Sequence, residues 1–102
     1  SAFLDGEPGE AEGLRQFMRR VVGDYARWQA RWIDELEDWS AEWQDASELS
    51  DLAMHLTPAQ LKALREELVA TIFRYRDAGP DGDDHERVVV LLQAFPQSGS
   101  VP

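Results

Sequence analysis

Residues 48–76 read ELSDLAMHLTPAQLKALREELVATIFRYR, and this stretch decides the predicted fold. Its first part alternates apolar residues with polar or small ones, the apolar ones being Leu52, Met54 and Leu56. Such alternation is typical of a strand with one buried face. Thr57 and Gln60 then enclose a proline, a spacing that predicts a capping box at the start of a helix. The stretch therefore predicts a strand, a sharp turn and a helix.

The helix predicted after this cap has one apolar face. Its apolar residues recur at steps of three and four, and they are Leu61, Leu64, Leu68, Ile72 and Tyr75. Residues 78–82 read AGPDG, which combines a C-cap glycine with proline and turn residues. We therefore expect the helix to end around Asp77.

A longer helix is predicted upstream, from about Glu10. Its apolar stripe consists of Leu14, Met18, Val21, Tyr25, Trp28, Trp32, Leu36, Trp39 and Trp43, again at steps of three and four. A helix from Glu10 to Trp43 would be about 50 Å long, whereas a compact domain of this size has a radius of gyration of about 13 Å. Either the helix breaks near Ser40, or a second chain covers its far end. We favour the second chain, and hence a homodimer.

The last predicted element is a strand over residues 87–94, because residues 88–92 form a continuous run of valine and leucine. The element order is then α-β-α-β, an α+β fold. Two strands alone are marginal, so we expect a dimer to complete the sheet through a dimer strand with Val88, Val90 and Leu92. Residues 1–102 form one domain in this prediction, with an extended arm at 1–9 and a loose tail at 97–102.

The composition restricts the classes of partner. The net charge is −10, and eight acids lie between Asp34 and Asp51 without a lysine or arginine among them. Such a chain repels phosphate backbones and is a poor nucleic-acid binder by itself. There is no cysteine, which excludes disulfides and thiolate metal sites and fits the cytoplasm. No apolar run reaches the roughly 18–20 residues that a membrane helix needs, so we expect no membrane partner.

The candidate binding face lies on the tryptophan-rich helix and comprises Tyr25, Trp28, Trp32, Leu36, Trp39 and Trp43. We favour a core or dimer interface over the wall of a pocket for a small apolar effector, since aromatic side chains commonly anchor interfaces. The acidic loop at 81–86 lacks the glycine and glutamate spacing of an EF-hand, so we expect no metal there. The sequence contains no phosphate loop and no nucleophile elbow, and we expect neither catalysis nor a cofactor.

Four segments together suggest a family: Leu56-Thr57-Pro58, Leu61 to Leu68, Arg74-Tyr75-Arg76 and Val88 to Pro96. Behind a tryptophan-rich helix, this order resembles the C-terminal half of actinobacterial ArsR-like winged helix-turn-helix transcriptional regulators. The resemblance implies a dimerisation and effector-sensing domain that contacts DNA only through a winged helix upstream of Ser1. A stand-alone small-molecule-binding or protein-interaction module with a tryptophan-lined face remains the alternative.

Overall fold

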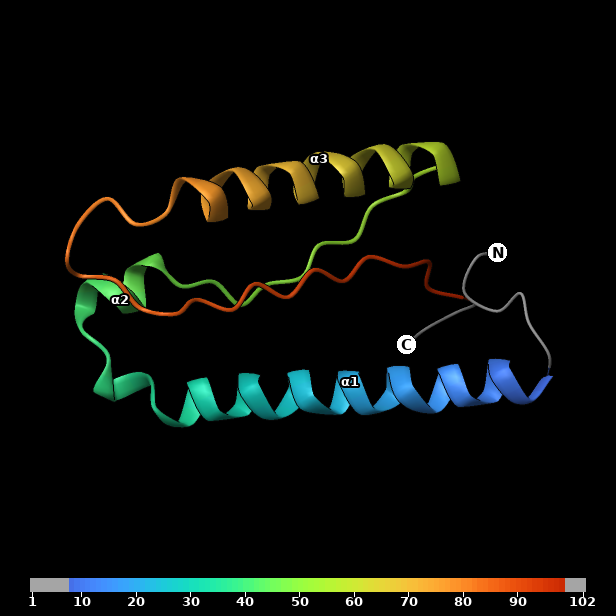
Figure 1. Ribbon diagram of the computed structural model, residues 1–102, viewed down its shortest axis with the longest axis horizontal. Coiled ribbons are helices and arrows are strands. Elements are labelled where there is room, and N and C mark those ends of the chain that lie inside the picture. The colour runs from blue at the N-terminus through green and yellow to red at the C-terminus, as the bar shows by residue number, and fades with distance from the viewer. Residues whose placement is uncertain (1–7, 99–102) are drawn as a thin grey trace. The chain divides into compact units, whose positions relative to one another are not determined.

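The computed structural model describes residues 8–98, and its regular elements are all helical (Figure 1). They are α1 (Pro8–Asp34), the 3-10 helix η1 (Leu36–Asp38), α2 (Ala41–Ala46) and α3 (Pro58–Ala78). The chain divides into two units between Ser50 and Asp51. The first unit contains α1, η1 and α2, and the second contains α3 with the open segments on either side of it.

Helix α1 confirms the predicted N-terminal helix but ends well before Trp43. Four carboxylates gather at its C-terminal end, and they belong to Asp34, Glu35, Glu37 and Asp38. The C-terminal end of a helix carries partial negative charge, so acidic side chains there oppose further helix. The chain instead forms η1, and α2 then begins after its N-cap residue, Ser40. Of the two alternatives raised by the sequence, the structure has the break, between Asp34 and Ser40, and not the continuous helix for which we favoured a covering second chain.

Helix α3 begins with the predicted capping box. The Thr57 hydroxyl accepts a hydrogen bond from the Gln60 backbone N–H at 3.2 Å, and the Thr57 N–H donates to Gln60 Oε1 at 2.9 Å. The helix ends at Ala78, where Gly79 adopts a φ of +74° and donates its N–H to the Tyr75 carbonyl at 3.2 Å. Both ends of α3 are therefore confirmed within one residue of their predicted positions.

The predicted α+β fold with a small sheet is wrong. Helices make up 62% of the structure, and none of residues 8–98 belongs to a strand. The segments predicted as strands, 51–56 and 87–94, are open chain (Figure 1), and Val88, Val90 and Leu92 are exposed without any strand around them. An alternating or β-branched pattern favours extended backbone, but a sheet also needs paired backbone groups, and side-chain patterns do not supply the pairing.

The described part of the chain has no buried core. Between residues 9 and 98 every side chain is exposed or half-buried. The predicted face of α3 is half-buried at Leu61, Leu64 and Ile72, but Leu68 is more open and Tyr75 is 76% exposed. Most of the predicted arm at 1–9, and the end of the tail at 97–102, lie outside the described residues. Each unit therefore retains apolar surface that its own elements leave uncovered.

Candidate interaction surface

One side of α1 carries a regular apolar series, which we call the α1 stripe. Its members fall into two rows with a step of seven residues, Leu14, Val21 and Trp28 in one row and Met18, Tyr25 and Trp32 in the other. Alternating steps of four and three are the spacing of a helix that packs lengthwise against another helix. Trp28 is 50% exposed, and the other five members are half-buried. The stripe thus has the pattern of a helix–helix seam.

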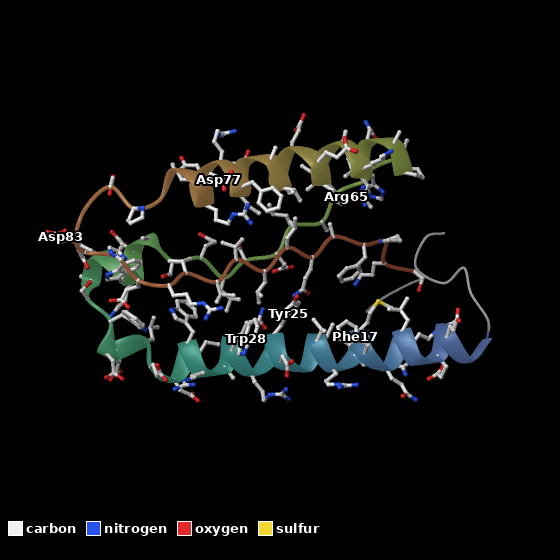
Figure 2. All side chains as sticks on the ribbon, in the orientation of Figure 1. Phe17, Tyr25, Trp28, Arg65, Asp77 and Asp83 are labelled. Carbon is white, nitrogen blue, oxygen red and sulfur yellow. The ribbon has the colours of Figure 1, made fainter. Side chains whose placement is uncertain are left out.

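Two aromatic residues of the stripe, Tyr25 and Trp28, are in contact. Figure 2 shows Phe17, Tyr25 and Trp28 on the same side of α1. The rings of Tyr25 and Trp28 have centroids 5.5 Å apart and planes tilted by 50°, a separation within the favourable range for aromatic pairs. Phe17 and Val22, on the flanks of the stripe, are each more than half exposed. The apolar surface on α1 is therefore only partly covered.

The remaining tryptophans of the predicted face lie on other elements. Trp39 follows η1, Trp43 lies in α2, and their ring centroids are 6.1 Å apart. Leu36 is in η1 and is half-buried. The predicted face is thus divided into two parts. Tyr25, Trp28 and Trp32 belong to the α1 stripe, and Trp39 and Trp43 form an aromatic pair that follows α1 along the chain.

Gln44 holds the turn between η1 and α2. Its side-chain amide nitrogen donates to the Leu36 carbonyl at 3.0 Å and to the Trp39 carbonyl at 2.8 Å. The Ser40 hydroxyl accepts the Trp43 backbone N–H at 3.3 Å, which caps α2. Neither α2 nor its cap was predicted from the sequence. A serine three residues ahead of Trp43 was the available signal, because that spacing is typical of an N-cap.

Arginines and carboxylates form ion pairs along α1. Arg15 and Arg19 approach Glu12 at 3.4 Å and 3.9 Å, and Arg27 pairs with Asp24. All these side chains are well exposed, so the pairs add little to stability.

At the C-terminal end of α1, the Arg31 guanidinium donates to Glu35 at 2.8 Å. This hydrogen bond and the negative charge of Glu35 raise the pKa of Arg31 above its ordinary value. The Glu35 carboxylate thus has one cation beside it, in an exposed pair at the end of α1.

A shallow depression of about 300 Å³ lies on α1 and is lined by Arg15, Met18, Arg19 and Val22. It is open to solvent, and none of the four tryptophans lines it. Ligand sites for small molecules are usually enclosed clefts that cover most of the ligand. This depression therefore gives the predicted apolar effector no enclosed, tryptophan-lined site.

The acidic loop after α3 is exposed throughout residues 81–86. Within this loop, the His85 N–H donates a backbone hydrogen bond to the Asp83 carbonyl at 3.1 Å. Within residues 8–98, no group of three or more histidine, aspartate and glutamate side chains is arranged to hold a metal ion. The side chain of His55 is exposed as well.

No protein-family model matches the chain, and neither a curated protein nor a solved structure matches it. The resemblance to ArsR-like regulators therefore stays a prediction that rests on the chain's own residues. One of the segments that carry it, residues 88–96, was expected to form a strand and does not. In the described part of the chain, no helix is both long enough and apolar enough to cross a membrane.

Proposed function

We propose that this chain is a helical protein-interaction domain that forms a homodimer through the α1 stripe. The observation that carries the proposal is the seven-residue repeat of apolar side chains along α1, none of which is buried. A soluble chain seldom leaves a continuous aromatic surface uncovered unless a partner covers it. Tyr25 and Trp28 contact each other within the repeat and would be the anchors, because aromatic residues dominate interface energies.

The context we propose is a DNA-binding transcriptional regulator of the cytoplasm, as the family resemblance suggests. The domain would hold two chains together and thereby set the spacing of two DNA readers. With a net charge of −10, the chain would contact DNA only through a domain upstream of Ser1. The sequence of the gene tests this context directly. A basic helix-turn-helix before Ser1 supports it, and any other upstream domain refutes it.

The dimer itself is tested by a charge placed in the stripe. Val21→Glu introduces a carboxylate at the centre of the predicted contact, whereas Ala30→Glu places the same charge on the opposite side of α1. In light scattering, the unaltered chain and Ala30→Glu should have twice the chain mass of 11.6 kDa. Val21→Glu should have the monomer mass. A monomeric unaltered chain at about 100 µM, where even weak dimers with micromolar Kd are populated, would refute the proposal.

A further inference from the structure

Charge is distributed very unevenly along the first unit. Residues 15–20 contain three arginines and no acid, whereas residues 34–38 contain four carboxylates and no base. We call these the basic segment and the acidic segment. Among the described residues, Glu35 alone of the four carboxylates is ion-paired. The basic segment lies at the N-terminal end of the stripe, and the acidic segment begins with the last residue of α1 and continues through η1, so the two ends of the stripe have neighbours of opposite charge.

We propose that the partner of the α1 stripe is a second copy of this chain that runs antiparallel to the first. This inference rests on the proposed function and adds the orientation. In an antiparallel pair, the basic segment of each copy lies beside the acidic segment of the other, and both ends are complementary. In a parallel pair, six arginines would gather at one end and eight carboxylates at the other. Charges at an interface act mainly on such choices of orientation.

The stripe also fits this orientation. When α1 of the second copy runs antiparallel so that paired residue numbers add to 53, Tyr25 lies against Trp28 and Val21 lies against Trp32. The same alignment places Arg19 opposite Asp34, so the basic segment lies beside the end of α1 from which the acidic segment continues. A shift by one repeat, to a sum of 46, would also pair apolar residues, but it would bring Arg15 beside Arg31 and Arg19 beside Arg27. Like charges side by side disfavour that register.

Distances between spin labels test the orientation, and the chain has no cysteine that could interfere. Gln16→Cys and Ala26→Cys each introduce one labelling site on an exposed part of α1. In the proposed pair, label 26 lies near the two-fold axis, whereas label 16 is displaced from its copy by about 30 Å along the helices, at 1.5 Å per residue. We expect distances of about 35 Å at position 16 and about 20 Å at position 26, with helix axes roughly 10 Å apart.

The outcomes separate the orientation from the dimer itself. Equal distances of about 20 Å at both positions mean a parallel pair, which overturns the inference but leaves the proposed function intact. A distance of about 28 Å at position 16 means the shifted register and also overturns it. The absence of any intermolecular distance, together with a monomer mass, overturns both proposals. Only a clear lengthening from position 26 to position 16, to about 35 Å, supports the antiparallel pair.

Charge reversal supplies an independent test. The triple variant Arg15→Glu, Arg19→Glu and Arg20→Glu should weaken dimerisation by at least about tenfold, since several exposed ion pairs would become repulsive. Its matched control on α3 is Lys62→Glu, Arg65→Glu and Arg74→Glu, which changes the net charge equally and should have a much smaller effect. Mixing the first variant with Asp34→Lys, Glu37→Lys and Asp38→Lys should restore dimers. Equal weakening by both triple variants, or no recovery on mixing, would overturn the inference.

Discussion

Truncation of Trp28 should weaken the dimer far more than truncation of an equally exposed residue off the stripe. Trp28 is 50% exposed, and a large aromatic side chain buries about 150–250 Å² when it is fully covered. About 100 Å² per copy is therefore left for the partner to cover, which at about 25 cal/mol per Å² corresponds to about 2.5 kcal/mol. Each dimer contains two copies. Trp28→Ala should thus cost between about 2 and 5 kcal/mol, or roughly thirtyfold to several-thousandfold in Kd.

The matched control is Ile33→Ala. Ile33 is 51% exposed, so it offers a comparable fraction of its side chain, but it lies five residues beyond Trp28. At about 100° per residue this places it about 140° from Trp28 and about 100° from the middle of the stripe, beyond the flank of the predicted contact. Sedimentation equilibrium across a dilution series gives both dissociation constants. Ile33→Ala should change Kd by less than about threefold, in line with substitutions outside a contact. Similar losses for the two variants would refute the reasoning, because they would show that exposure and not position on the stripe sets the cost.

Three further predictions concern single turns of the chain. Thr57→Ala removes the hydroxyl of the capping box and should destabilise α3 by about 1 kcal/mol, seen as lower helix content in circular dichroism, whereas Thr71→Ala inside α3 should raise it. Gly79→Ala should lower the free energy of unfolding by about 1–2 kcal/mol, through the positive φ alone, since no atom lies within 4 Å of the added carbon. Its control, Gly82→Ala, is equally open but has no positive φ and should be nearly neutral. Gln44→Glu replaces the donor to two carbonyls by a carboxylate and should loosen the contact between Trp39 and Trp43, with a reduced near-ultraviolet circular dichroism signal; an unchanged signal would contradict the role given to Gln44.

The sequence predicted those features whose causes are local. The capping box needs only Thr57 and Gln60 three residues apart, and the end of α3 needs only a glycine that tolerates positive φ. The α1 stripe follows from helical periodicity, and six of its members were identified from their spacing alone. In each case the residues that decide the structure are neighbours along the chain.

The strand predictions were wrong because a strand depends on pairing with residues far away along the chain. Leu52, Met54 and Leu56 alternate as a strand requires, and Val88 to Leu92 form a β-branched run, yet neither segment is in a sheet. Their side chains favour extended backbone without deciding which backbone groups pair. The predicted end of α1 was wrong for a different reason. The apolar steps of three and four continue beyond Asp34 to Trp43, but the acidic side chains after Asp34 oppose further helix. Apolar periodicity alone therefore overestimated the length of the helix.

The acidic segment links the fold of the first unit to its proposed assembly. Its four carboxylates oppose the helix dipole, which explains why α1 stops at Asp34 and why Ser40 starts a new helix. The same charges disfavour a parallel partner, because two such segments side by side would repel each other. A substitution such as Asp34→Lys should therefore act on both levels, by extending α1 and by weakening the antiparallel pair with the basic segment. If α1 lengthened while the dimer held its affinity, the acidic segment would be a helix stop only, and the orientation of the pair would have to come from the apolar side chains.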